Sequence, residues 1–290
     1  MKAIYLDTFA GISGNMFLGA LLDAGFPFEV LEKELQKLHI GQYELVYQQV
    51  NKLGIEAKYF NVLLPEEHAH EHHHEHEHEH HHEHCHEHHH GAEVHEHCHE
   101  PHHEHEHEHG ALPHTHHHHE HRNLNDVMGI INSSELSASI KIKAEKVFRA
   151  IAVAEGKVHG KPLDEVHFHE VGAIDTIIDI VGTLLGLEYL GIERVYVGKV
   201  NTGHGYVKCA HGIMPVPAPA TAEILQDFPQ ERGIVAKEMT TPTGAALLKV
   251  LASVALEQPA SFRSSLIAYG AGSREVEIPN VLRMFVGEDE

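Results

Sequence analysis

The chain has few cysteines, no long hydrophobic run and no recognisable export signal. Its 290 residues include three cysteines, Cys85, Cys98 and Cys209. An odd number of cysteines without a secretion signal argues against a disulfide framework and for a reducing compartment. The first residues, MKAIYLDTFAG, lack the charged and apolar regions of a signal peptide, and no apolar run is long enough to cross a bilayer. We therefore expect a soluble, cytoplasmic protein with no membrane partner.

Basic residues are also scarce. The chain has 21 lysines and arginines against 43 aspartates and glutamates, and its formal net charge is -22 when histidine is counted as neutral. A surface of this charge repels nucleic acid phosphates and anionic lipids, so we expect neither as a partner. The same surface attracts cations.

Histidine is abundant, and it is concentrated in one segment. All but six of the 35 histidines lie between residues 68 and 121, where the sequence consists almost only of His and Glu. Such a segment lacks the apolar side chains that offset the entropy of ordering, so we predict a disordered insert over residues 66–122. We call this insert the histidine tract.

The histidine tract is predicted to bind metal ions. Neutral imidazole binds nickel, zinc, copper and cobalt, and the glutamates supply oxygen ligands and balance the charge. In a flexible chain many ligand sets can form, so we expect several weakly held, exchangeable ions. The alternative is a solvated insert with incidental metal affinity. The expected ligands include His72, His74, His76, His84, His86, Cys85 and Cys98.

Two ordered parts, residues 1–65 and 123–290, flank the histidine tract. Residue periodicity predicts strands at Ala3–Phe9, Tyr43–Val50, Ile55–Leu64, Val166–Val171, Val195–Val200, Ile234–Met239 and Val281–Val286. It predicts helices at Asn15–Ala24, Pro27–His39, Ser134–Glu155, Ala173–Leu190, Pro217–Leu225 and Pro242–Leu256. This alternation indicates an α/β or α+β protein with mixed sheets flanked by helices.

The segment HFHEVGAIDTIID contains the most concentrated cluster of chemistry-bearing residues in the second part. In a strand, His167 and His169 share one face and Glu170 lies on the other. On the following helix Asp175 and Asp179 are one turn apart, and a bound cation or substrate group would offset their repulsion. We predict that His167, His169 and Glu170 ligate a metal and that Asp175 and Asp179 have catalytic roles. The alternative is a structural pair of histidines and a solvent-facing pair of aspartates.

A loop from Thr202 to Pro219 combines His204, Cys209 and His211 with several glycines. Sulfur and imidazole ligands together suit nickel, copper or zinc, so these three residues are further candidate metal ligands. The glycines would let the backbone approach a ligand closely. The alternative is a connector with a buried, inert cysteine.

A glycine-rich turn follows the first predicted strand and leads into a helix. Its backbone amides at Gly11, Ser13, Gly14 and Asn15 would form an anion site at the positive end of that helix. Asp7, at the end of the strand, could hold a metal bound to the anion or orient a hydroxyl group, which makes it a candidate catalytic residue. The segment is not a Walker A loop, because the lysine and its spacing are missing.

A second candidate anion site is the segment TTPTG, which includes Thr241 and Thr243. Here Thr241 suits the N-cap position of a helix and Pro242 suits the first helical position. Helix capping accounts for these residues, so the pattern favours an ordinary helix start over an anion site.

Taken in order, the motifs resemble the LarC family of nickel insertion proteins. The matching pieces are DTFAGISGNM, the His-rich insert, HFHEVGAIDTIID, NTGHG, HGIMPVPAPAT and TTPTGAALL. The resemblance implies CTP-dependent insertion of nickel into pyridinium-3,5-bisthiocarboxylic acid mononucleotide, with carbon–nickel and sulfur–nickel bonds, to form the cofactor of lactate racemase. In the family, CTP and Mg²⁺ or Mn²⁺ are associated with a C-terminal domain, and we expect this chain to comprise the N-terminal region without it.

The resemblance implies three partners: the pyridinium nucleotide, the C-terminal domain, and lactate racemase as recipient of the product. It leaves the formation of a homo-oligomer open. Three functions stay open from the residues themselves. The first is nickel insertion by a chelatase, the second is a metallochaperone or metal store without chemistry, and the third is a metal-dependent hydrolase built on His167, His169, Asp175 and Asp179.

Overall fold

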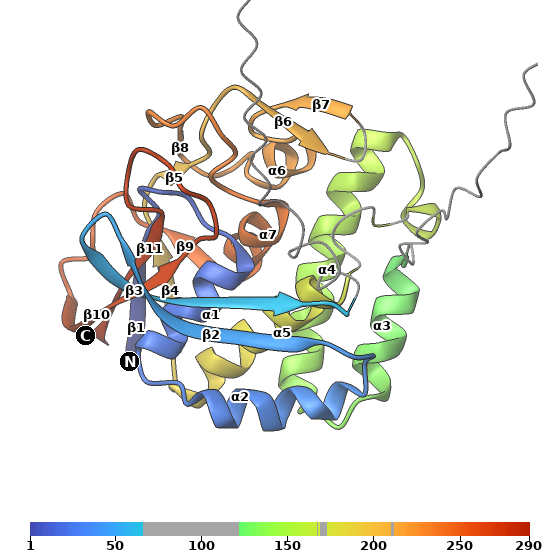
Figure 1. Cartoon of the computed structure of the whole chain (residues 1–290), viewed down its shortest axis with the longest axis horizontal. Helices are drawn as coiled ribbons and strands as arrows, with labels where there is room; N and C mark the ends of the chain where they lie inside the picture. The colour runs from blue at the N-terminus through green and yellow to red at the C-terminus, as the bar shows by residue number, and fades with distance from the viewer. Residues whose placement is uncertain (66–121, 167, 169–172, 210–211) are drawn as a thin grey trace, which may run out of the picture. The chain divides into compact units, whose positions relative to one another are not determined.

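A mixed seven-stranded sheet forms the centre of the fold (Figure 1). The computed structural model describes residues 1–65, 122–166, 168, 173–209 and 212–290. The strand order is β2-β3-β10-β11-β1-β4-β9. The strands are β1 Lys2–Asp7, β2 Glu44–Lys52, β3 Ile55–Leu63, β4 Arg194–Val197, β9 Ala252–Val254, β10 Phe262–Ala271 and β11 Val281–Asp289. The predicted fold class, α/β with a mixed sheet flanked by helices, is confirmed.

Both flanks of the histidine tract contribute to this sheet. The strands β1, β2 and β3 precede the tract, and the other four strands follow it. β1 lies between β11, to which it is antiparallel, and β4, to which it is parallel. β10 pairs with β3 in parallel through Gly270 and Ala271. The two flanks therefore build one folded unit.

Helices pack against the sheet and against one another around a continuous apolar core. The helices are α1 Gly14–Asp23, α2 Phe28–Leu35, α3 Leu124–Ser133, α4 Ala138–His159, α5 Ile174–Tyr189, α6 Pro219–Ile224 and α7 Pro242–Leu251, with short 3-10 turns at Gln36–Leu38 and Leu163–Glu165. α1 packs on β3 and β10, and α5 packs on α1. α4 contacts α5, α6 and α7. None of the helices in the described ranges is long and apolar enough to span a bilayer.

Two small ladders lie outside the main sheet. The first pairs β5 (Val200–Asn201) with β8 (Gln230–Glu231) in parallel. The second is a hairpin of β6 (Tyr206–Cys209) and β7 (Gly212–Pro215). The hairpin places Cys209 at a cavity that Pro219 and Pro242, the first residues of α6 and α7, also line.

Several predicted elements differ from the structure. The predicted strand at Val166–Val171 is wrong at Val166 and Phe168, which are buried in irregular backbone. The amide of Phe168 donates to the carbonyl of Arg122, the last residue of the histidine tract, at 3.0 Å, so Phe168 is tied to the end of the tract and not to a neighbouring strand. The predicted strand at Ile234–Met239 is an irregular loop, and the helix from Pro242 ends at Leu251.

Candidate functional site

Three of the predicted motifs converge at the end of β1, although they are far apart in the sequence. The amide of Ile12 donates to the carbonyl of Met239 at 3.1 Å, and the amide of Thr241 donates back to the carbonyl of Ile12 at 3.0 Å. The side-chain amide of Asn201 donates to the carbonyl of Phe9 at 2.5 Å. The segments DTFAGISGN, NTGHG and TTPTG therefore form one structural unit.

The glycines of the first motif allow this close contact. Gly11 has φ +78°, and a Cβ there would lie 1.9 Å from the carbonyl oxygen of Met239. A Cβ at Gly14 would lie 2.7 Å from the carboxylate of Asp179 and 3.0 Å from the methyl group of Thr243. The room beside both glycines is thus filled by protein, so the structure gives them a packing role.

Asp179 lies against the N-terminus of α1. Ser13 occupies the N-cap position without a capping hydrogen bond, and the amide of Asn15 donates to Asp179 instead. Burial and the charge of Asp175 raise the pKa of Asp179 well above its usual value, and the hydrogen bond from Asn15 opposes this rise. The two aspartates interact across one helical turn, as their spacing predicts. Asp179 caps a neighbouring helix, which the sequence pattern did not indicate.

Asp7 forms an ion pair on the sheet. Its carboxylate accepts a hydrogen bond from Nε of Arg283 at 3.0 Å and contacts the guanidinium through a second nitrogen. That guanidinium also lies over the rings of Phe9 and Phe285, at 5.5 and 5.4 Å from their centroids. Asp7 is not among the residues that line the two cavities described below, so its position favours a structural role.

A polar cavity of about 110 Å³ lies beside the converging motifs. Its lining consists of Ser13, Asn15, Met16, Glu238, Met239, Thr241, Gly272, Ser273, Arg274 and Asn280. Three predicted nucleotide-binding residues, Ser13, Asn15 and Thr241, are among them, whereas Gly11, Gly14 and Thr243 are not. Thr241 also caps α7, since its hydroxyl accepts a hydrogen bond from the amide of Gly244 at 3.2 Å, and this confirms the predicted helix start.

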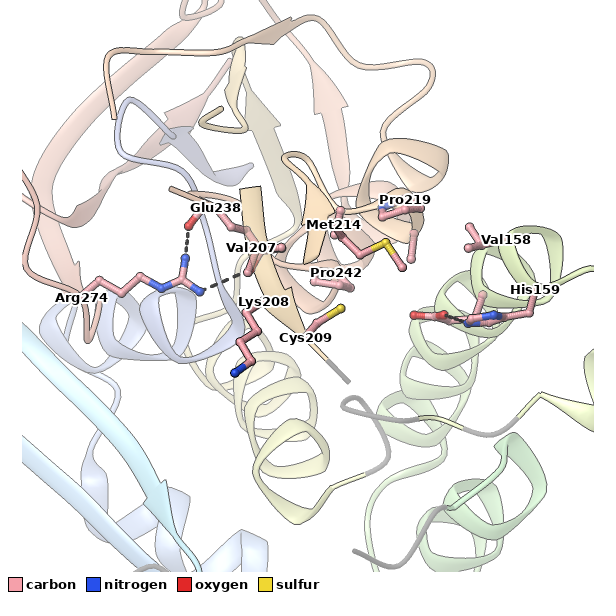
Figure 2. A pocket seen from close by; sticks show the side chains of 13 residues that line it. Val158, His159, Val207, Lys208, Cys209, Met214, Pro219, Glu238, Pro242 and Arg274 are labelled. Carbon is pink, nitrogen blue, oxygen red and sulfur yellow. Dashed lines mark hydrogen bonds and ion pairs between the residues drawn. The ribbon is translucent and has the colours of Figure 1, made fainter. Parts of the chain in front are cut away.

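A second cavity of about 180 Å³ lies between α4, α6 and the β6–β7 hairpin, and we call it the cysteine cavity. Figure 2 shows Cys209 and Met214 on the hairpin, with His159 facing them from α4. The imidazole of His159 lies 3.2 Å from the carboxylate of Glu155. The cysteine cavity is lined by Glu155, Val158, His159, Val207, Lys208, Cys209, Met214, Ala218, Pro219, Ala220, Glu238, Pro242 and Arg274.

The predicted metal ligands are only partly covered by the structure. Cys209 is a free, partly buried thiol that lines the cysteine cavity. His204 lies before β6, and its Nε2 is 3.4 Å from the carbonyl of Ile234, away from both cavities. Within the described ranges, no group of three or more His, Cys, Asp or Glu residues could hold a metal ion. The ligands predicted at His167, His169, Glu170, His211 and in the histidine tract lie outside the described residues.

Sequence reasoning missed four residues that the cavities bring forward: His159, Met214, Glu238 and Arg274. The i, i+4 spacing of Glu155 and His159 was a usable signal, but the predicted helix ended at Glu155. Arg274 lies between β10 and β11, and β10 was not predicted. Its guanidinium bonds to the backbone and carboxylate of Glu238, which only the tertiary structure reveals.

Comparison with known proteins identifies the family. A family model described as nickel insertion protein matches residues 4–290. The chain belongs to the nickel insertion protein family. This confirms the predicted resemblance, and the converging motifs are segments on which that resemblance rests.

Curated members of the nickel insertion protein family align with the whole chain. Three of them, each named pyridinium-3,5-bisthiocarboxylic acid mononucleotide nickel insertion protein, cover 100% of it. The protein of Clostridium acetobutylicum is 46% identical, that of Clostridium kluyveri 44% and that of Geobacillus kaustophilus 41%. The chain spans 65%, 63% and 60% of their respective lengths. No solved structure matches the chain.

Proposed function

We propose that the chain binds pyridinium-3,5-bisthiocarboxylic acid mononucleotide and takes part in the insertion of nickel into it. The observation that carries this proposal is the convergence of family motifs on one polar cavity, in a chain that aligns over its whole length with proteins named for this substrate. Because the chain spans about three fifths of those relatives, the complete reaction is assigned to this chain together with the family's C-terminal domain.

The phosphate of the mononucleotide is assigned to the polar cavity. Its walls offer the hydroxyls of Ser13, Thr241 and Ser273, the amide of Asn280 and the guanidinium of Arg274. Charge-assisted hydrogen bonds from guanidinium to phosphate are among the strongest in proteins. The side chain of Arg274 is 40% exposed, so it can bind a ligand while it keeps its contact with Glu238.

Nickel is assigned a path from the histidine tract to the thiol of Cys209. The tract would collect the ion, since neutral imidazoles bind nickel and exchange it readily when no fixed geometry holds it. Cys209 then supplies a soft ligand at the cavity. His204, which lies away from the cavity, and His211 are retained only as candidate ligands on the path to it. His167, His169 and Glu170, which precede α5 in the sequence, are retained as candidate transfer ligands.

CTP with Mg²⁺ or Mn²⁺ is assigned to the C-terminal domain, and no residue of this chain is assigned to either. The predicted catalytic roles of Asp7, Asp175 and Asp179 are not carried into the mechanism. The reason is that Asp7 pairs with Arg283 and Asp179 bonds to the N-terminus of α1. The contribution of this chain is thus to hold the acceptor and to deliver the ion.

Reconstitution tests the proposal. The chain is incubated with nickel, CTP, Mg²⁺ and the pyridinium mononucleotide, with and without a C-terminal domain from a relative. Metallated product is followed by mass spectrometry and by activation of lactate racemase. We expect product only in mixtures that contain this chain together with the domain. Absence of product from the complete mixture would contradict the proposal.

A matched pair of variants assigns the phosphate site. Arg274→Gln should raise the nucleotide concentration needed for half-maximal rate, because a charged phosphate contact is lost. Arg263→Gln removes the same charge from β10, where the arginine bonds to the carbonyls of Ala260 and Phe262, and should leave this concentration unchanged. Equal effects of the two variants would exclude the polar cavity as the phosphate site.

A second candidate function is nickel storage without chemistry. The observation that favours it is the concentration of 29 of the 35 histidines in one segment. Under this alternative, essentially all nickel binding belongs to the histidine tract, and the folded unit neither binds the mononucleotide nor yields product. The reconstitution above therefore separates the two functions.

A further inference from the structure

The polar cavity and the cysteine cavity share a wall. Glu238 and Arg274 line both of them, and Pro242 of the cysteine cavity directly follows Thr241 of the polar cavity. Two adjacent cavities with different linings suit a ligand with two chemically different ends. A mononucleotide is such a ligand, because a ribose links its phosphate to its ring.

The cysteine cavity has the size and the walls for a small aromatic ring. A cavity of roughly 150 Å³ with apolar walls accommodates benzene, and the cysteine cavity measures about 180 Å³. Apolar side chains form much of its lining, among them Val158, Val207, Pro219 and Pro242 (Figure 2). The polar cavity, at about 110 Å³, is smaller and is lined by hydroxyl and amide groups.

The charges at the cysteine cavity complement a ring that carries charges of both signs. Arg274 and Lys208 bring positive charge, and no described residue pairs with the ammonium group of Lys208. Glu238 and Glu155 bring negative charge from other parts of the lining. A pyridinium ring has a positive nitrogen, and its thiocarboxylate groups are negative, so both signs find a counterpart.

A thiol distinguishes this cavity from the polar cavity, whose sulfur-bearing side chains are those of Met16 and Met239. The thiol of Cys209 and the thioether of Met214 both line the cysteine cavity from the hairpin (Figure 2). Soft ligands of this kind suit nickel and copper. Since no three His, Cys, Asp or Glu side chains of the described ranges cluster as a metal site, an ion bound here needs donors besides the described side chains. The sulfur atoms of a thiocarboxylate ring are suitable donors.

We propose that the cysteine cavity receives the thiocarboxylate-bearing pyridinium ring while the polar cavity holds the phosphate, so that Cys209 faces the sulfur atoms that take up nickel. This inference rests on the proposed function and adds the position of the ring. It makes Arg274 a contact at the junction of the two cavities and Cys209 the protein ligand closest to the acceptor sulfurs.

Protection of Cys209 from alkylation tests the position of the ring. The metal-free chain is treated with iodoacetamide in the presence of nicotinic acid mononucleotide, which has a pyridinium ring, one carboxylate and a phosphate. Peptide mass spectrometry follows each cysteine separately, so Cys85 and Cys98 of the same molecule are the references. At a probe concentration ten times its Kd, mass action predicts that alkylation of Cys209 slows about tenfold, while the two references react unchanged.

Ribose 5-phosphate is the control ligand. It carries the phosphate but no ring, so it should bind in the polar cavity and leave the alkylation rate of Cys209 unchanged. Nicotinic acid mononucleotide that binds by calorimetry without slowing the reaction of Cys209 would overturn the proposal. Equal protection by ribose 5-phosphate would overturn it too, because protection would then not report on the ring.

A cavity-filling variant gives an independent test. Ala218 lines the cysteine cavity, whereas Ala222, one turn along the same segment, does not. Ala218→Leu should weaken nicotinic acid mononucleotide at least tenfold and leave ribose 5-phosphate binding unchanged, and Ala222→Leu should change neither. An unchanged affinity of a folded Ala218→Leu variant would contradict the proposal, and if this variant fails to fold, the alkylation test decides.

The two proposals fail in different ways. If Cys209 is protected but the reconstituted mixture yields no metallated product, the proposal of nickel insertion is contradicted and the proposed ring site is supported. If product forms but Cys209 is not protected, the proposed ring site is contradicted and the proposal of nickel insertion is supported.

Discussion

At the scale of single residues, Asp179 provides a hydrogen-bond acceptor that α1 lacks at its own N-terminus. Its carboxylate accepts from the amide of Asn15, while burial and Asp175 raise its pKa. Because the pKa is raised on folding, the folded protein holds this proton more tightly than the unfolded chain. The contribution of this carboxyl to stability is full below the ordinary pKa of an aspartate and is lost as pH rises through the raised value.

Asp179→Asn should remove this decline, because an amide does not titrate yet still offers an oxygen to Asn15. The free energy of unfolding, measured by urea denaturation at several pH values from 4 upward, should depend less on pH than in the parent protein. Asp179→Ala leaves the amide without its partner and should lower stability by about 1–3 kcal/mol. An unchanged pH dependence in Asp179→Asn would show that this carboxyl does not control the profile.

Residue identity alone did not reveal which polar groups are committed to structure. Asp7 was predicted as catalytic because it ends a strand before a glycine-rich turn, and Asp179 because it lies one helical turn from Asp175. In the structure Asp7 pairs with Arg283 and Asp179 caps α1. Arg283 is far from Asp7 in the sequence, and Asn15 belongs to a different helix from Asp179, so residue spacing could not indicate either contact. Thr241, in contrast, was predicted as an N-cap, because capping depends on a residue only three positions away.

At the scale of elements, the turn between β1 and α1 depends on glycine at one position. Gly11 has a positive φ, and a Cβ added to it would lie 1.9 Å from the carbonyl oxygen of Met239. Gly25 also has a positive φ, +103°, but nothing lies within 4 Å of its added Cβ. Substitutions at Gly25 and Gly11 therefore separate the energetic cost of backbone strain from that of a steric clash.

Gly25→Ala should destabilise the protein by about 1–2 kcal/mol, the cost of placing an L side chain in the left-handed region. Gly11→Ala meets the same strain and also a backbone clash, so its loss should be clearly larger, and the contact between the loop and Met239 should open. Thermal unfolding of both variants checks this order. Similar losses in the two variants would contradict the close approach.

Strongly periodic elements could be predicted from the sequence. The apolar stretches of α1 and α5 and the pair β2–β3 were predicted within a few residues of their bounds. β10 was missed because a bulge between Ser264 and Leu266 breaks its alternation and much of its first half is exposed. The loop at residues 234–239 alternates like a strand, yet its β-pairing is limited to an isolated bridge between Gly203 and Glu238.

At the scale of the whole molecule, the cavities could not be predicted, since their walls come from segments that only the fold brings together. Arg274 lies between β10 and β11, Cys209 on the hairpin, and Ser13 before α1. Their charges and donor groups are individually ordinary. The glycine-rich motifs marked one wall of the polar cavity, and nothing in their spacing indicated the opposite one.

Replacing residues 66–121 by a glycine–serine segment of equal length should remove most nickel binding and leave the thermal midpoint of the folded unit unchanged. Equilibrium dialysis with metal analysis measures the number of ions bound per chain. A second variant, with glutamine for every histidine of the tract and the glutamates kept, separates imidazole ligation from charge. If the glycine–serine variant still binds as many ions as the parent protein, the tract is not the main nickel site. If only the glutamine variant does, imidazole is not the main ligand within the tract.

Nickel bound to the histidine tract should also be released in mild acid. Imidazole protonates with a pKa of about 6.5, and a protonated ring cannot ligate a metal. Lowering the pH from 7.5 to 5 should therefore release most of the bound ions in the parent protein, as measured in the same dialysis. Retention at pH 5 would point to carboxylate or thiolate ligands instead.

The two ends of the described chain meet on neighbouring strands. The amide of Asp289 donates to the carbonyl of Met1 at 2.8 Å, and β1 runs antiparallel to β11 from that point. A force that pulls the ends apart would consequently break the hydrogen bonds of this pair one after another, as in a zipper, and not all at once in shear. The centre of the sheet would be mechanically soft along this one direction.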